Sequence, residues 1–534
     1  MKTKFFIMTL LVISTAFLSC TDDLVELNIN PNEPEIAPTA NIFTSATKEF
    51  IDFSRDGFNE GRLTLPWMQY WGQTAYADED RFLYRETTAE SIYTNTYLTM
   101  RDFKAILDLN TNEETKEAAA LYGNNDNQIA ASRIMLSYMF YELTNFFGDV
   151  PYYSYGSDNE TFQAAQLEAG NFTPVFAAQQ DIYTDILKEL RESADMINED
   201  EIVFTNGDNI FNGDALKWKK FANSLILRVA TTIKGVDTEA YETAFDTAIT
   251  SGVMTSNDDN ASQEYDTIDV SASPLWTAYI TRTDFAVAAP FVELLKGERG
   301  NFNPDPRLFQ MAVPITASIN EVKAGYEADL DTLDYGDYLG VPYAFRNTNF
   351  LDRTTYSFPS SNVIKPDYRE VFMEYAEVEF LISERNGFAQ ANYENGVTAS
   401  MEKWGVPEAD VTTFVANLPA ANQANVLNQK YIALYMQAHQ AYTEYRRTGF
   451  PNTLVQIDET VALPQQQIDG LAPDNRVETY VFEAGPVDPS VSDIPFRLRY
   501  PQILQNLNGA NRDAAAANLS NGDLIISKLF WDVN

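Results

Sequence analysis

The chain has 534 residues, of which 45% are hydrophobic and 13% aromatic, and its 77 acidic against 37 basic residues give a formal charge of −40. This apolar content is enough for a large folded core. The net negative charge repels the phosphates of nucleic acid and so opposes binding to it. A single histidine, His439, and a single cysteine, Cys20, exclude H-E-x-x-H and C-x-x-C sites, and they exclude any Ser-His-Asp triad that does not use His439.

The first twenty residues have the pattern of a lipoprotein signal peptide. Two lysines precede an apolar run from Phe5 to Leu18 that is too short for a transmembrane helix. Leu18-Ser19-Cys20 resembles a lipobox, so we expect residues 1–19 to be a signal peptide and the Cys20 thiol to carry the lipid that anchors the protein to a membrane. The alternative is a cysteine that stands there by chance. Residues 20–35 are predicted to form an extended tether.

Residues 36–534 are predicted to form a single, mainly α domain with two helical blocks. Helical periodicity extends over about 40–250 and returns over about 367–450, whereas about 251–366 and 451–534 are loop-rich. Asp214 is a candidate N-cap for a helix whose Trp218 and Phe221 are expected in the core. The helices come in pairs similar to tetratricopeptide repeats, which stack into a wall that carries loops as a binding face.

The stretch LTLPWMQYWGQTAYADEDRFLY, residues 63–84, is the densest mixture of aromatic and polar side chains. Sugars need flat aromatics against their C–H faces and polar groups at the edge for their hydroxyls. Candidate ligand residues are therefore Trp67, Tyr70, Trp71, Gln73, Tyr76, Asp78 and Arg81. On a helix, the four-residue spacing would place Trp67 and Trp71 on one face. The alternative is burial in the scaffold, although Pro66 and the acidic loop that follows favour a helix-to-loop junction with some exposed part.

A second candidate stretch, SPLWTAYITRTDF at residues 273–285, lies in the irregular middle of the chain. Its candidate ligand residues are Trp276, Tyr279 and Arg282, and with Asp284 they are expected to face the first stretch. The alternative reading is again that they pack within the scaffold.

Six segments in order, behind the lipoprotein signal, carry a resemblance to a known family. They are LNINPNEPEIAP, TNFFGDVPYY, DNIFNGDALKWKKFANSLILRVA, YAEVEFLISE, NQKYIALYMQAHQAYTEYRRTGFP and the ending from RLRYPQILQNLNGANRDAA to KLFWD. Over nearly the whole mature chain this pattern resembles the SusD/RagB family of nutrient-binding outer-membrane lipoproteins, in its SusD-like second branch.

The resemblance implies a fold and a function. The fold would be mainly helical, with tetratricopeptide-like helix pairs as a scaffold and an irregular ligand-binding region. The protein would be a non-catalytic, cell-surface lipoprotein that captures an oligosaccharide or polysaccharide and delivers it to a SusC-like TonB-dependent transporter. An aromatic platform near residues 63–84 contributes to glycan binding in the family, and the central segment often completes the site.

Other readings stay open at this point. A member of the family that binds peptides is the first alternative, and a surface glycoside hydrolase or lyase is a less favoured one. The negative net charge slightly favours a neutral glucan or mannan as the ligand.

His439 lies in an aromatic-rich helical pattern and is expected to be structural. The Asp/Asn-rich loops lack EF-hand spacing, so no cofactor and no metal site is predicted, although structural Ca²⁺ remains open.

Overall fold

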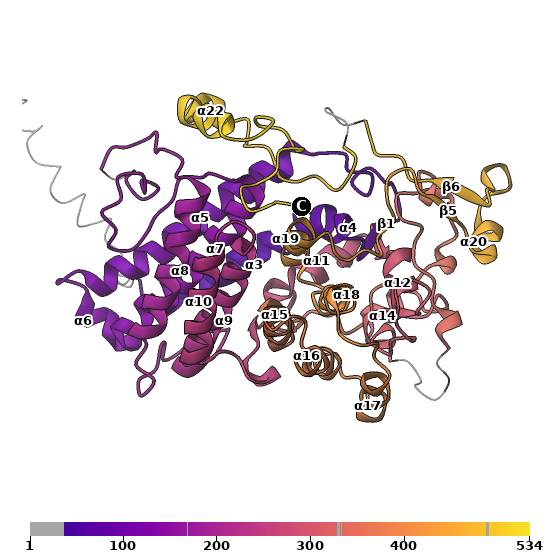
Figure 1. The fold of residues 1–534 in the computed structure, drawn as a ribbon, viewed down its shortest axis with the longest axis horizontal. Helices are drawn as coiled ribbons and strands as arrows, with labels where there is room; N and C mark the ends of the chain where they lie inside the picture. Colours follow the sequence, from indigo (N-terminus) through magenta and orange to yellow (C-terminus); the bar gives the residue numbers. More distant parts are fainter. Residues whose placement is uncertain (1–36, 168, 328–331, 333, 487–490) are drawn as a thin grey trace, which may run out of the picture.

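The computed structural model describes residues 37–167, 169–327, 332, 334–486 and 491–534 (Figure 1). The predicted signal peptide, Cys20 and the tether at 20–35 lie outside the described residues. Within the described residues, no helix is both long enough and apolar enough to cross a membrane.

The first helical block stacks its helices in chain order, on the left in Figure 1. It consists of α3 (Thr39–Ser54), α5 (Glu86–Thr111), α6 (Lys116–Ala119), α7 (Asn125–Phe147), α8 (Gln179–Met196), α9 (Ala215–Ile233) and α10 (Thr238–Ser251). Asp214 caps α9 as predicted, because its side chain accepts a hydrogen bond from the Lys217 backbone N–H. Trp218 and Phe221 of α9 are fully buried, as expected from the apolar stripe of this helix.

The second helical block lies below the centre of Figure 1 and packs against the first through α9 and its own first helix, α15. It consists of α15 (Tyr375–Arg385), α16 (Gln390–Lys403), α17 (Glu408–Ala416), α18 (Gln423–Ala433) and α19 (Ala438–Thr448). The predicted mainly α fold is confirmed. Arg447 at the end of α19 pairs with Glu384 and Glu444, both at 2.7 Å, whereas Arg446 donates to the carbonyls of Asn145 and Phe496.

The remaining chain forms short elements around these blocks. The short helices include η1 (Glu60–Thr64, a π-helix), α4 (Leu65–Trp67), α11 (Pro274–Thr281), α12 (Ala289–Leu295), α13 (Leu308–Met311), α14 (Ile319–Lys323), η8 (Arg353–Thr355), α20 (Gln465–Gly470), α21 (Leu504–Leu507) and α22 (Gly509–Ala517). The described residues contain three antiparallel strand pairs: β1 (Trp71–Gln73) with β3 (Phe285–Val287), β2 (Ala261–Gln263) with β4 (Glu370–Met373), and β5 (Thr460–Ala462) with β6 (Thr479–Val481). The first two pairs join segments that are far apart in sequence.

His439 belongs to a buried polar cluster that joins α3, α7 and α19. Arg55 follows α3, and its guanidinium lies 2.6 Å from His439 Nδ1 and 2.6 Å from Glu142 Oε1. Burial alone would raise the pKa of Glu142, but Arg55 and His439 hold it below its usual range. Burial, together with the charge of Arg55, lowers the pKa of His439 to about 4. Its contacts are therefore those of a neutral, packed imidazole that accepts a hydrogen bond from Arg55.

This depressed pKa predicts a loss of stability in mild acid. The unfolded chain takes up a proton on His439 near its ordinary pKa of about 6.5, whereas the folded protein does so only near pH 4. The contribution of His439 to the free energy of unfolding should therefore fall by roughly 3 kcal/mol as the pH drops from about 6.5 to 4. His439→Gln keeps an acceptor for Arg55 but cannot titrate, so its urea midpoint should fall less over that range.

The comparison of the two proteins isolates the histidine. Burial raises the pKa of Glu60 to about 8, which gives stability a pH slope of the opposite sign. Glu60 is present in both proteins, so its contribution cancels in the difference between their urea midpoints. Parallel midpoint curves for wild type and His439→Gln between pH 4 and 6.5 would contradict the prediction.

Candidate functional site

The two stretches that were expected to face each other lie side by side. Strand β1 pairs with β3 in the register Trp71↔Val287, Gly72↔Ala286 and Gln73↔Phe285. Beyond the pair, the Thr74 N–H donates to the Asp284 carbonyl at 2.8 Å and the Thr74 hydroxyl to the Thr283 carbonyl at 2.7 Å. Residues 71–76 and 282–287, about 210 positions apart in the chain, therefore share one edge.

Trp67 and Trp71 do not share a helical face, which corrects the expectation from their spacing. Trp67 ends the three-residue helix α4, and Trp71 begins β1. The break lies between them, where Gln69 takes a φ of 55° in the left-handed region that ends a helix. Gln69 is held there by its side chain, which donates to the Val455 carbonyl at 2.8 Å and accepts from the Val455 N–H at 2.9 Å.

Five of the predicted ligand residues are buried in the core: Trp67, Tyr70, Trp71, Gln73 and Tyr279, none more than 1% exposed. The Trp71 indole N–H donates to the Tyr435 hydroxyl at 3.0 Å, and Tyr70 stacks on Tyr431 with ring centroids 4.4 Å apart. The Tyr279 hydroxyl donates to the Phe285 carbonyl, and the Gln73 amide to Glu79. These side chains therefore position β1, β3 and α11, and in this structure they present no ring face to a ligand.

The solvent-accessible part of this edge is a group of five side chains, here called the Tyr76 cluster: Phe58, Arg62, Tyr76, Arg282 and Asp284. Asp284 Oδ2 lies 2.8 Å from Arg282 and 3.8 Å from Arg62, and it accepts from the Tyr76 hydroxyl at 3.3 Å. The Arg62 guanidinium lies over both aromatic rings, 5.7 Å from the centroid of Tyr76 and 5.6 Å from that of Phe58.

The chemistry of the Tyr76 cluster is that of a polar binding edge with aromatic rings. Burial of the Tyr76 phenol raises its pKa to about 12, so the hydroxyl stays a neutral donor. Arginine, carboxylate and phenol groups next to a half-exposed ring are the groups that bind sugar hydroxyls and stack on a sugar face.

The other predicted ligand residues have mixed positions. Trp276 on α11 is half-buried, and its indole N–H is buried without a hydrogen-bond partner. Asp78 is half-buried, and its carbonyl accepts from the backbone N–H groups of Arg81 and Leu83. The Arg81 guanidinium donates to the carbonyls of Glu483 at 2.8 Å and Ala484 at 3.3 Å, so it holds the C-terminal segment in place.

Two members of the Tyr76 cluster were missed by the sequence analysis. Arg62 precedes the quoted 63–84 stretch by one residue, and Phe58 lies four residues before Arg62. No motif marks either of them. The signal that would have found them is their proximity in sequence to the aromatic stretch.

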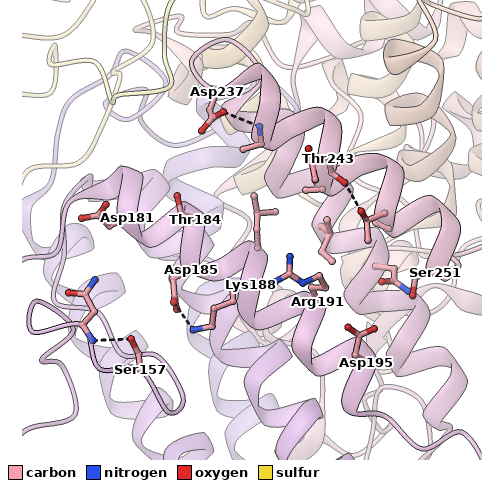
Figure 2. Close-up of a pocket in the computed structure, with 18 of the residues that line it drawn as sticks. Ser157, Asp181, Thr184, Asp185, Lys188, Arg191, Asp195, Asp237, Thr243 and Ser251 are labelled. Atoms are coloured by element: carbon pink, nitrogen blue, oxygen red, sulfur yellow. Dashed lines mark hydrogen bonds and ion pairs between the residues drawn. The ribbon is translucent and has the colours of Figure 1, made fainter.

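A groove with a volume of about 690 Å³ lies elsewhere, between α8 and α10. Figure 2 shows Arg191 of α8 in the space between the two helices, with Asp195 further along α8, whereas Lys188 points towards Asp185. Lys188 pairs with Asp185 at 2.8 Å. Phe162 is the one aromatic residue among those that line this groove, and the α10 side is made of small residues, so the groove offers a sugar little to stack on.

Comparison with known proteins settles the family. A protein-family model, SusD-like and described as "Starch-binding associating with outer membrane", matches residues 31–468. The chain belongs to the SusD-like family. The resemblance found in the sequence is thereby confirmed. No curated protein matches the chain.

Solved structures similar to this SusD-like protein share its fold over almost their whole length. A chitin-binding protein superposes with a TM-score of 0.70 at 22% identity, covering 93% of this chain and 100% of the other. A SusD homologue from Bacteroides fragilis gives 0.68 at 20% identity, with 93% and 99% covered. A chitin-binding SusD homologue from Flavobacterium johnsoniae gives 0.68 at 18% identity, with 92% and 99% covered. At these identities the likeness shows the fold.

Proposed function

We propose that this SusD-like protein is a non-catalytic glycan-binding lipoprotein at the outer face of the outer membrane. It captures an oligosaccharide or polysaccharide at the Tyr76 cluster and passes it to a SusC-like TonB-dependent transporter. The observation that carries the site is the β1–β3 pairing, which brings two aromatic and arginine-bearing segments to one edge. The family description, starch-binding and associated with the outer membrane, supports the class of ligand and the location.

Two further observations support parts of this proposal. Two of the similar structures are described as chitin-binding, which shows that this fold accommodates a glycan. The predicted lipid on Cys20 would keep the protein at the membrane surface, where a transporter could receive its ligand. Capture without catalysis needs neither a cofactor nor a metal ion. Within the described residues, no group of three or more His, Cys, Asp or Glu side chains is placed to hold a metal.

The proposal is tested by affinity electrophoresis of the mature chain with Cys20→Ser, through gels that contain laminarin, mannan, starch, xylan, pectin or alginate. We expect one of these polymers to retard the protein. Tyr76→Ala should cut the retardation about tenfold in apparent affinity, because it removes a ring face and a hydroxyl donor. Tyr122 is a half-buried tyrosine that ends η2 (Ala120–Tyr122), the short helix after α6. Tyr122→Ala is therefore the matched control and should migrate like wild type.

The alternatives give different results in the same experiment. Release of new reducing ends from the retarding polymer would show a glycoside hydrolase, and appearance of unsaturated products would show a lyase. No retardation by any polymer or by their oligomers, together with binding of peptides in calorimetry, would replace the glycan by a peptide. The preference for neutral glucan or mannan, drawn from overall charge, stays a prediction until the panel is run.

A further inference from the structure

Four cationic side chains converge on one short loop of this very acidic protein. The loop, as the term is used here, is residues 280–284, which comprise the last two residues of α11 and the three residues that lead to β3. Arg282 and Arg62 lie 2.8 and 3.8 Å from Asp284. Arg353 of η8 donates to the Thr283 hydroxyl at 2.8 Å, and Lys323 of α14 to the Ile280 carbonyl at 3.2 Å. These cations come from four separate segments of the chain. The fold brings them together, since they do not form a run of basic residues in the sequence.

Most buried cations elsewhere in the described chain are matched by carboxylates. Arg133 meets Glu189 and Glu192, Arg228 meets Glu377, and Arg307 meets Asp305. At the 280–284 loop, by contrast, Arg353 and Lys323 make their contacts to a neutral hydroxyl and a neutral carbonyl. Those two contacts orient the side chains without offsetting their charge.

The carboxylates near the loop already have partners. Asp284 is shared among Arg282, Arg62 and the Tyr76 hydroxyl, and its side chain is 13% exposed. Asp56 is largely buried, accepts from the Phe58 and Asn59 backbone N–H groups, and has a pKa raised by burial. Asp352 turns back to accept from the Thr354 N–H and hydroxyl. Within the described residues, Asp284 is the one carboxylate that lies within 4 Å of any of these four cations, and Arg62 and Arg282 share it.

The distant negative charge does not cancel this local excess. Charges on exposed side chains are screened beyond about 8 Å at physiological salt, so a ligand at the loop senses mainly the nearest groups. Arg282 and Arg353 are both exposed, and Arg62 and Lys323 are half-buried. Arg62 and Arg282 are placed to meet a ligand at the Tyr76 ring, because Arg62 lies over that ring and Arg282 shares Asp284 with the Tyr76 hydroxyl. Arg353 and Lys323 reach the same segment at Thr283 and Ile280.

Resting on the proposed glycan-binding function, we propose that the Tyr76 cluster together with Lys323 and Arg353 takes a glycan that contains uronic acid. A uronic acid residue has an apolar C–H face for the Tyr76 ring and a planar carboxylate for the arginines. The guanidinium fork of Arg282 or Arg353 matches a carboxylate through two parallel hydrogen bonds, which gives such a sugar an advantage over a neutral one. The neutral glucan or mannan predicted from overall charge is the competing ligand.

The test is calorimetry on the mature Cys20→Ser protein with oligogalacturonate, oligomannuronate, mannohexaose, laminarihexaose, chitohexaose and dextran sulfate. We expect a uronate oligomer to bind best, and its affinity should fall when NaCl is raised from 50 to 200 mM. Arg282→Gln and Arg353→Gln should each weaken it about tenfold or more, since each removes a charged hydrogen bond. Arg369→Gln is the matched control, because Arg369 is equally exposed and pairs with Glu264 at the β2–β4 edge.

The outcomes separate this inference from the function on which it rests. A neutral oligomer that binds best, with equal affinity in both arginine variants, overturns the uronate inference and leaves the glycan-binding function standing. Dextran sulfate that binds as tightly as the uronates overturns the selectivity for a carboxylate. No binding of any sugar by a protein whose circular dichroism is that of the folded chain overturns both.

Discussion

Replacing Arg228 by methionine is expected to lower the free energy of unfolding by about 3–5 kcal/mol, because it leaves a buried carboxylate without its partner. Arg228 on α9 holds Glu377 on α15 through two contacts, Nε to Oε1 at 2.9 Å and Nη2 to Oε2 at 2.5 Å. Both side chains are 1% exposed, and Nη2 also donates to the Phe372 carbonyl at 3.0 Å. The pair spans the junction of the two helical blocks, so its loss should lower the urea midpoint of the whole transition.

A second ion pair across the same junction provides the matched control. Arg385 of α15 meets Asp246 of α10 at 3.3 Å, with side chains 27% and 68% exposed, and Arg385→Met should cost no more than about 1 kcal/mol. The double variant Arg228→Met/Glu377→Leu should recover most of the loss, because neither buried charge then remains. Equal urea midpoints for Arg228→Met and Arg385→Met would show that the buried pair does not stabilise the junction.

The helical blocks were predictable from sequence because helix formation leaves a local signal. The stripe of apolar residues in α8 and the Asp214 cap of α9 are set by residues within one or two turns. Pairing between β1 and β3 has no such signal, since the strands have three residues each and lie about 210 positions apart. The prediction that these segments face each other came from composition and from the resemblance to the family, and the register came only from the structure.

The candidate site was harder to predict, because exposure is decided by distant partners. Trp71 and Tyr76 both suit a sugar platform by residue type, and they stand five positions apart. Trp71 is buried because the Tyr435 hydroxyl, 364 positions away, accepts its indole N–H. Tyr76 stays accessible because the chain leaves the strand after Gln73 and turns the ring towards Asp284. Arg353 and Lys323 join the same loop from segments that lie about 70 and 40 positions further along the chain, and no motif marks them.

The different positions of Trp71 and Tyr76 predict opposite consequences for stability and binding. Trp71 is fully buried, edge-on to Tyr279 with ring centroids 5.9 Å apart and 6.0 Å from Phe285. Trp71→Ala should therefore cost about 3–5 kcal/mol of unfolding free energy through the cavity it leaves. Trp71→Phe, which fills most of that space, should cost less and should keep the glycan affinity of wild type. Tyr76→Ala should change stability by less than about 1 kcal/mol and yet bind the glycan about tenfold more weakly.

Urea denaturation and calorimetry on the same three preparations give the two quantities separately. Trp71→Ala has to be compared with Trp71→Phe. Loss of binding in Trp71→Ala alone would be explained by unfolding of the β1–β3 edge. Binding that is lost in Trp71→Phe at unchanged stability, and kept in Tyr76→Ala, would mean that the indole itself contacts the sugar. The edge would then have to open by breaking the Trp71–Tyr435 hydrogen bond, and the ligand site would move from the Tyr76 cluster to the buried face of β1.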